Sequence, residues 1–147
     1  MGLGPRGSLV RLVGIVLMSL LVGAWAQPAT LPATEPEAFV VVTSAEQVVG
    51  TWHVGTNFLR FDKDGTVREA VGRDARDARP YAIHTFHFKA GVMLLAEVAV
   101  SGVPSCGDAV GRYEVRLLAD GRLEIVLFED PCSDRARNVT RVYEQVE

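Results

Sequence analysis

Metal ligands and basic residues are sparse in this sequence. It holds two cysteines and three histidines, and none of them forms a CxxC or HxxxH pair, which argues against a zinc site. Lys and Arg number 15 against 18 Asp and Glu, so the surplus of positive charge typical of nucleic-acid-binding proteins is missing. There is also no internal repeat of about 20–50 residues, which excludes solenoid and propeller architectures.

No apolar run is long enough to cross a membrane. The longest, Leu12–Trp25, spans about 15 residues, whereas a membrane-spanning helix needs about 20. Arg6 and Arg11 flank its start, and Ala24-Trp25-Ala26 has the pattern of a cleavage site, so residues 1–26 are predicted to be a signal peptide. The alternative is an uncleaved anchor. We expect a secreted or periplasmic protein without stable membrane insertion after cleavage.

The remaining chain, about 120 residues, is enough for one domain with a modest core. Residues 27–42 are rich in proline and are predicted to form an N-terminal linker. The end of that linker, Ala38–Val42, is either a short strand or an apolar lead-in. Residues 43–147 are predicted to form the folded domain.

The domain has the composition of an antiparallel β protein. Capping-box spacing from Ser44 to Gln47 predicts a short helix first, ending at Gly50. Segments rich in Val, Leu, Phe and Thr follow, separated by Gly, Asp and Pro. The first two of these segments are either separate strands or one strand bent at Gly55. The predicted strands are Gly50–Gly55, Asn57–Asp62, Thr66–Val71, Tyr81–Phe88, Val92–Val100, Val110–Leu118, Arg122–Phe128 and Val139–Val146.

Three loops share one pattern, three residues that end in glycine: Lys63–Gly65, Lys89–Gly91 and Ala119–Gly121. A three-residue hairpin loop with a G1 bulge needs a positive φ at its last residue, which glycine supplies. This loop length places apolar residues opposite one another, whereas a two-residue loop mixes the faces. The predicted pairs are Leu117–Leu123, Val115–Ile125, Tyr113–Leu127, Phe61–Val67, Leu59–Glu69, Phe88–Val92, Phe86–Leu94 and His84–Ala96.

These hairpins predict an up-and-down barrel of about eight strands, which closes on itself and removes its edges. The three tight turns lie at one end. The longer connections Gly72–Pro80, Ser101–Ala109 and Glu129–Asn138 lie at the other end and form an open mouth. Ligand sites in small barrels are usually found at such mouths.

Cys106 and Cys132 are predicted to form a disulfide. An even number of cysteines in an exported chain favours a disulfide over two buried free thiols. The register of the Ala119–Gly121 hairpin also places the two residues just beyond the strand ends, one diagonal step apart. We expect the bond to stabilise the domain by roughly 3 kcal/mol.

The run from the short helix into Gly50-Thr51-Trp52, followed by hairpins such as Leu59–Thr66, resembles lipocalin-like bacterial domains of the calycin group. The stretch Cys106–Cys132 is similar to an exported branch of them. The resemblance implies that Trp52 packs at the closed base of the barrel, with Gly50 before it and the helix beneath. It also implies a basic residue of the last strand over Trp52, for which Arg141 is the nearest candidate.

Two ionisable residues are predicted to face the barrel interior. His84 points inward with the neighbouring phenylalanines, either as a core histidine or as a polar group in a pocket. Glu69 falls on the same face, either because the strand frays or as a pocket carboxylate across from His84. His87 points to the opposite face, so the two histidines do not share a metal ion. No nucleophile motif is present, and we expect no enzyme activity, no cofactor and no metal.

The leading hypothesis is therefore an exported protein that binds a small apolar or amphipathic ligand. Small residues on the inward face place its pocket near the mouth, with Arg76 and Arg79 at the rim. The predicted pocket walls are His84, Ala96, Val98, Tyr113 and Leu127. The alternative is an interaction protein such as a β-barrel protease inhibitor, in which residues 27–42 would contact a protein partner.

Overall fold

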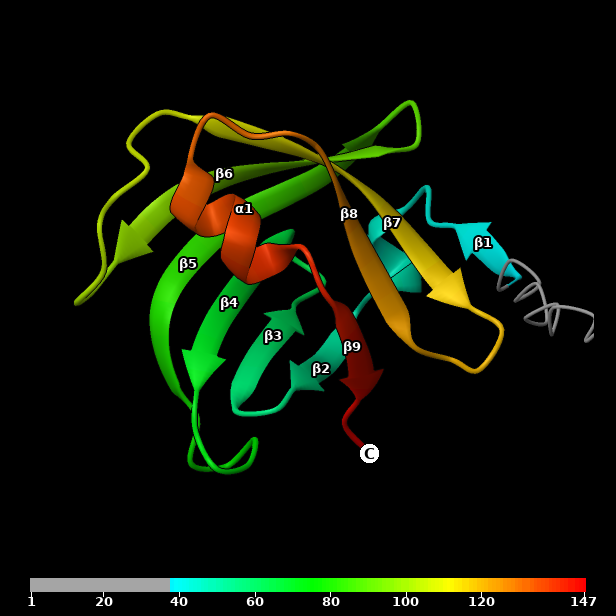
Figure 1. Cartoon of the computed structure of the whole chain (residues 1–147), viewed down its shortest axis with the longest axis horizontal. Helices are drawn as coiled ribbons and strands as arrows, with labels where there is room; N and C mark the ends of the chain where they lie inside the picture. Colours follow the sequence, from blue (N-terminus) through cyan, green and yellow to red (C-terminus); the bar gives the residue numbers. More distant parts are fainter. Residues whose placement is uncertain (1–37) are drawn as a thin grey trace, which may run out of the picture. The chain divides into compact units, whose positions relative to one another are not determined.

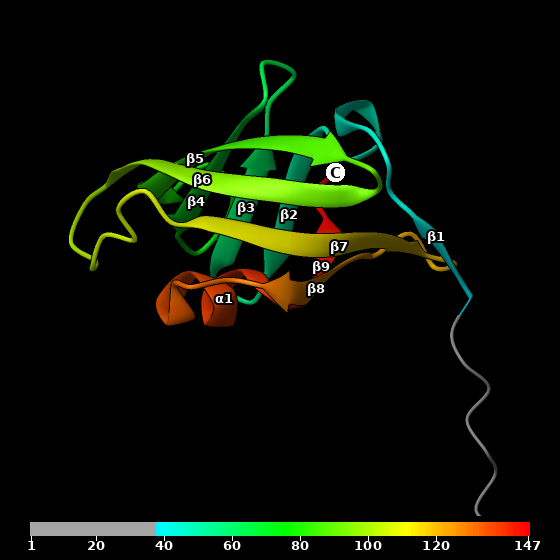
Figure 2. The ribbon, with the colours of Figure 1, turned by 90° about the horizontal axis from the view of Figure 1, so that it is seen from above.

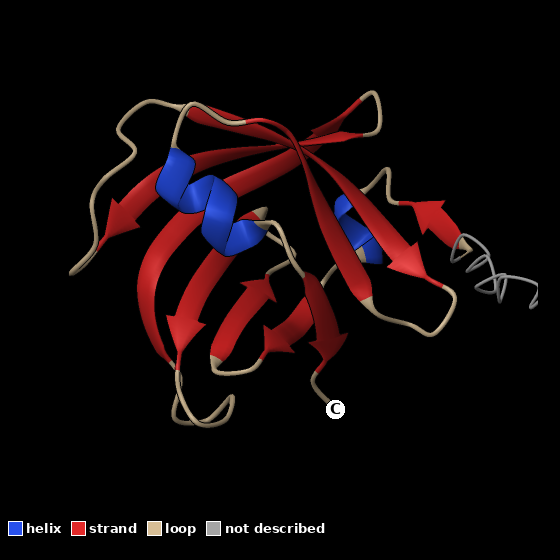
Figure 3. Cartoon of the chain, viewed as in Figure 1, coloured by secondary structure: helices blue, strands red, loops and turns tan. Residues whose placement is uncertain are grey.

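A computed structural model of the chain describes residues 38–147. The predicted signal peptide and most of the predicted linker lie outside the described residues. Within residues 38–147, no helix is long and apolar enough to span a bilayer. The strands are β1 Phe39–Val41, β2 Gly50–Val54, β3 Asn57–Phe61, β4 Thr66–Val71, β5 Arg79–Lys89, β6 Val92–Val100, β7 Val110–Leu118, β8 Leu123–Glu129 and β9 Val142–Gln145 (Figures 1 and 3).

Eight of these strands form the predicted barrel. Strands β2 to β9 each pair antiparallel with the next one along the chain, and β9 pairs with β2 to close the sheet (Figures 1 and 2). The all-β, up-and-down fold predicted from the sequence is confirmed. Gly55 and Thr56 lie between two separate, hydrogen-bonded strands, so the alternative of a single bent strand is wrong.

Strand β1 is an addition to this barrel. It pairs with the C-terminal half of β7, from Phe39 opposite Leu118 to Val41 opposite Arg116. Strand β6 pairs only with the N-terminal half of β7, because its register with β7 ends at Tyr113. The short-strand alternative for the linker's end is therefore the observed one. The residue after β1, Val42, is fully buried in the core.

Two of the three predicted hairpin registers are confirmed. The pairs across Ala119–Gly121 and Lys63–Gly65 are the predicted ones. The register across Lys89–Gly91 is wrong by one residue, because Ala90 and Gly91 alone form the loop, with φ values of 51° and 76°. Positive φ at both central residues is the type I′ geometry of a two-residue hairpin loop.

The helices differ from the prediction. The N-terminal helix is a single 3₁₀ turn, Ala45–Gln47, in which the Gln47 side chain accepts hydrogen bonds from the Thr43 and Ser44 N–H groups. The α-helix, α1, spans Ser133–Val139 and lies between β8 and β9, in a stretch predicted as loop and strand (Figure 3). The last strand is therefore shorter than predicted.

The core fills the barrel with the apolar faces of the strands. Trp52 is buried, and its indole N–H donates to the Val48 carbonyl at 2.8 Å, directly after the 3₁₀ turn. The β9 residue opposite Trp52 is Gln145. Arg141 precedes β9 and its side chain is exposed. The prediction that Arg141 lies over the buried Trp52 is therefore wrong for this chain.

Cys106 and Cys132 form the predicted disulfide, with their Cα atoms 5.5 Å apart. Cys106 lies in the loop between β6 and β7, and Cys132 is the N-cap residue of α1. The bond therefore joins the β6–β7 loop to the start of the helix.

Candidate functional site

A cavity of about 230 Å³ lies where α1 and the β6–β7 loop meet the open end of the barrel. We call it the α1 cavity. Its walls come from β4, β5, β6, the β6–β7 loop and α1. The lining residues are Glu69, Tyr81, Ala82, His84, Glu97, Val100, Val103, Pro104, Cys106, Asp134, Arg135 and Asn138.

Glu69 and His84 form a buried pair in the wall of this cavity. His84 Nε2 lies 2.7 Å from Glu69 Oε1, and the two side chains are only 2% and 5% exposed. The Tyr81 hydroxyl donates to the other oxygen of Glu69, Oε2, at 2.8 Å. Burial, and then the neighbouring Glu69 charge, raise the pKa of Tyr81, so this hydroxyl keeps its proton and acts as a donor.

A second buried pair lies on the helix side. Arg135 of α1 donates from Nε and Nη2 to the two oxygens of Asp130, at 2.7 and 2.8 Å, and from Nη2 to the Ala109 carbonyl. Burial opposes ionisation of Asp130, but hydrogen bonds from Arg135 and from the Tyr113 hydroxyl outweigh it and lower the pKa of Asp130. Both partners are therefore charged, and each neutralises the other.

Glu97 orders the loop at the cavity entrance. Its carboxylate accepts hydrogen bonds from the Ser105 hydroxyl and from the Cys106 N–H, and these two contacts lower the pKa of Glu97. The loop is thus attached to β6 through Glu97 and to α1 through the disulfide. Two independent links fix this wall of the cavity.

Two polar atoms of residues that line the cavity have no hydrogen-bond partner within the described part of the chain. They are Nδ1 of His84 and Nη1 of Arg135, and both are buried. Leaving a buried polar group without a partner costs roughly 1–3 kcal/mol. In native structures such an atom is usually satisfied by an ordered water or ion, or it is part of a functional site.

The structure brings together only part of the predicted pocket. Glu69 and His84 line the α1 cavity as predicted. In the β5–β6 register His84 lies opposite Glu97 and not opposite Ala96, because the loop joining the two strands is one residue shorter than predicted. That shift turns Ala96 to the other face of β6, and Val98 is 62% exposed, so neither lines the cavity.

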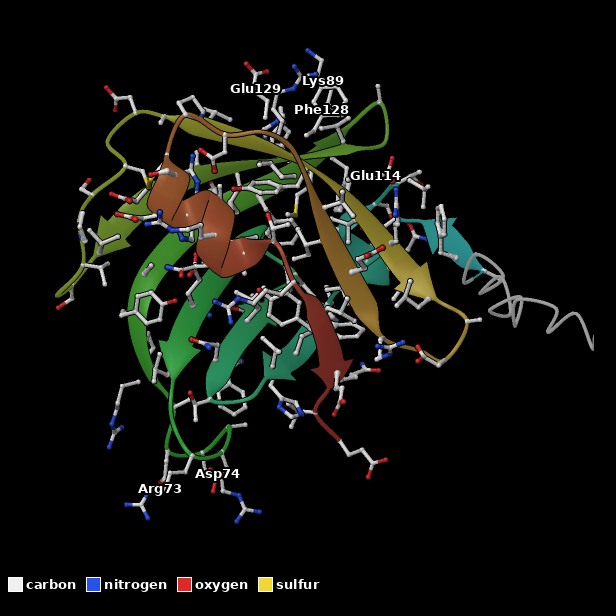
Figure 4. The ribbon with its side chains drawn as sticks, in the orientation of Figure 1. Arg73, Asp74, Lys89, Glu114, Phe128 and Glu129 are labelled. Atoms are coloured by element: carbon white, nitrogen blue, oxygen red, sulfur yellow. A yellow bond between two sulfur atoms is a disulfide. The ribbon has the colours of Figure 1, made fainter. Side chains whose placement is uncertain are left out.

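The other predicted walls also lie elsewhere. Tyr113 is fully buried in the core and does not line the cavity. Leu127 is 44% exposed, beside a register shift in the pairing of β7 with β8. Arg76, in the β4–β5 connection, and Arg79, the first residue of β5, are both exposed and do not line the cavity. Arg73 and Asp74 of the same connection point away from the barrel (Figure 4).

Sequence reasoning missed the residues contributed by α1. Arg135 lies in the polar run Ser133–Asn138, which has the composition of a solvated loop. The only apolar signal is the spacing of Ala136 and Val139, three residues apart and both buried. Tyr81 and Glu97 lie on predicted strands, but nothing in the sequence distinguished them from surface residues. Nowhere in residues 38–147 do three or more potential metal ligands gather closely enough to hold an ion.

Comparison of this chain with protein-family models, with characterised proteins and with solved structures finds no match to any of them.

Proposed function

We propose that this domain is an exported binding protein that holds a small amphipathic molecule in the α1 cavity. The observation that carries the proposal is a largely apolar cavity whose lining also includes polar side chains such as Tyr81 and Asn138. Apolar walls such as Val100 and Pro104 would supply most of the affinity, and the polar side chains would orient one end of the ligand.

The size of the cavity limits the ligand. A volume of 230 Å³ is about eight times the share of one water molecule in the liquid, and below the roughly 300–1,000 Å³ of drug-sized sites. A ligand of one ring or a short branched chain fits this volume. A haem or a long fatty acid would not fit wholly inside it.

The up-and-down barrel also supports the lipocalin-like, calycin-type membership inferred from Gly50-Thr51-Trp52. Proteins of that architecture bind ligands at the open end, which supports the proposed function. The disulfide is compatible with the exported location. We infer binding and not catalysis, because the sequence holds no nucleophile motif to accompany the Glu69–His84 pair. The inhibitor alternative has less support, because Phe39–Val41 is hydrogen-bonded into the sheet.

A matched pair of tryptophan substitutions on β6 tests the proposal. Val100→Trp places a bulky side chain in the cavity wall, whereas Val98→Trp places the same side chain on the exposed face. Small aromatic and branched aliphatic compounds are titrated into the ¹⁵N-labelled mature protein, and amide shifts are followed by NMR. We expect shifts clustered around the cavity in the wild type and in Val98→Trp, and their loss in Val100→Trp. Shifts that survive Val100→Trp would locate binding elsewhere and refute the proposal.

A further inference from the structure

The ion pairs that α1 brings to the cavity are balanced. Arg135 lines the cavity and is paired with the buried Asp130. Asp134 also lines the cavity and is paired with Arg137 on the exposed side of the helix. Opposite charges held this close together largely cancel at the distance of a ligand. The helix therefore adds little net charge to the cavity.

The Glu69–His84 pair adds either no charge or one negative charge. The Tyr81 hydroxyl keeps its own proton and donates it to Glu69 Oε2. One hydrogen joins Glu69 Oε1 to His84 Nε2, whichever of the two atoms holds it. The pair is then neutral if the imidazole also carries a hydrogen on Nδ1, and negative if it does not. In neither state does it contribute positive charge.

Glu97 is the charge on the cavity that remains without a charged partner. Its carboxylate accepts from the Ser105 hydroxyl and the Cys106 N–H, which are both uncharged donors. These bonds lower the pKa of Glu97, so it is negative at neutral pH. The residue is partly exposed, and each carboxylate oxygen can accept a further hydrogen bond. The lining as a whole is therefore negative, with an accessible carboxylate on β6.

Apolar surface lies directly beside this carboxylate. Val103 and Pro104 line the same cavity and immediately precede the two residues that donate to Glu97. The loop is fixed at that point, because Cys106 is also bonded to the start of α1. An organic cation can use both the carboxylate and the apolar surface, whereas an organic anion is repelled. A bare metal ion is not favoured, since no three potential ligands gather within residues 38–147.

We infer that the α1 cavity takes a small hydrophobic amine in its protonated form. The ammonium group lies at the Glu97 carboxylate and donates to it, directly or through one water. The hydrocarbon part lies against Val100, Val103 and Pro104. This inference rests on the proposed function and narrows it to one chemical class.

Three probes of similar shape and different charge test the inference: benzylamine, benzyl alcohol and benzoate. Each is titrated at neutral pH into the ¹⁵N-labelled wild type, into Glu97→Gln, and into Glu114→Gln. Glu114 is the control, because it is a carboxylate of β7 that does not line the cavity (Figure 4). We expect the wild type and Glu114→Gln to bind benzylamine about threefold to fivefold more tightly than benzyl alcohol, as a partly exposed ion pair provides, and benzoate most weakly. In Glu97→Gln benzylamine and benzyl alcohol bind equally.

A salt series on the wild type covers the case in which Glu97→Gln does not fold. Raising the NaCl concentration from about 10 mM to about 1 M shortens the screening length from about 30 Å to about 3 Å. We expect the preference for benzylamine over benzyl alcohol to shrink toward one over this range. The ratio of the two affinities is compared, so that the effect of salt on the shared benzyl group cancels.

The outcomes separate the two levels of the argument. Equal binding of benzylamine and benzyl alcohol at low salt, tightest binding of benzoate, or a preference for benzylamine that survives Glu97→Gln or high salt would each overturn the amine class. The proposed function would stand in all of these cases. Failure of all three probes to shift amides around the cavity would overturn the proposed function, and this inference with it.

Discussion

The Cys106–Cys132 bond closes a segment with a sequence separation of 26, and we expect its loss to destabilise the domain substantially. In the chain-entropy model a closed loop of this length removes enough freedom from the unfolded chain to be worth about 3.5 kcal/mol at 25 °C. An unfolding entropy of about 2.1 cal/mol/K per residue over the 110 or so folded residues converts this into a fall in Tm of about 15 °C.

The assay is thermal unfolding followed by circular dichroism. The oxidised mature protein is compared with the Cys106→Ser/Cys132→Ser double variant, and with the wild type in a dithiol reductant. We expect both to melt at the same lowered temperature, because each removes the same constraint. Mass spectrometry of the alkylated native protein checks that no free thiol is present at the start. A change in Tm below about 3 °C in both samples would refute the entropic reasoning.

Three further predictions concern single residues. Burial alone would raise the pKa of Asp130, but hydrogen bonds from Arg135 hold it below the ordinary 3.8, so its stabilising contribution is present above about pH 4 and is lost as the pH falls through the folded-state pKa. The free energy of unfolding should therefore fall less with decreasing pH in Asp130→Asn than in the wild type. Gly111→Ala overlaps the Asp130 carboxylate and should cost about 1–3 kcal/mol in urea unfolding, against about 1 kcal/mol for Gly102→Ala, where the added Cβ meets open space and only positive φ opposes it. Ala90→Asn should stabilise by up to about 1 kcal/mol, since asparagine tolerates the positive φ of this turn; a loss of stability would contradict the type I′ assignment.

The strands were predictable from the sequence because turn chemistry and side-chain alternation agreed along most of the chain. Around Ala119–Gly121 only one loop length puts apolar residues opposite one another, so the register follows. Around Lys89–Gly91 the same test fails, because Val92–Leu95 is apolar at every position and either register would bury apolar side chains of β6. There the positive φ of Ala90 determines the loop length and the register, and the sequence does not indicate that an alanine adopts a positive φ.

The cavity was predictable only where it is built from strands. Alternation placed Glu69 and His84 on the inner face, and they meet there. Arg135 was not predictable, because α1 is seven residues long and its burial depends on a partner, Asp130, that precedes the helix in an irregular turn. Helices this short are stabilised by their tertiary contacts more than by local sequence preference.

The pairing of β1 with β7 has a consequence for how the chain tolerates cleavage. Without Phe39–Val41, the peptide groups of Arg116–Leu118 would lose their partners on that side, because β6 has already turned away from β7. An unpaired β edge flanked by exposed apolar side chains is a template for association with another chain. Cleavage before Phe39 therefore keeps this part of β7 paired, whereas cleavage a few residues later, between β1 and the 3₁₀ turn, would let β1 dissociate and expose β7 to edge-to-edge association.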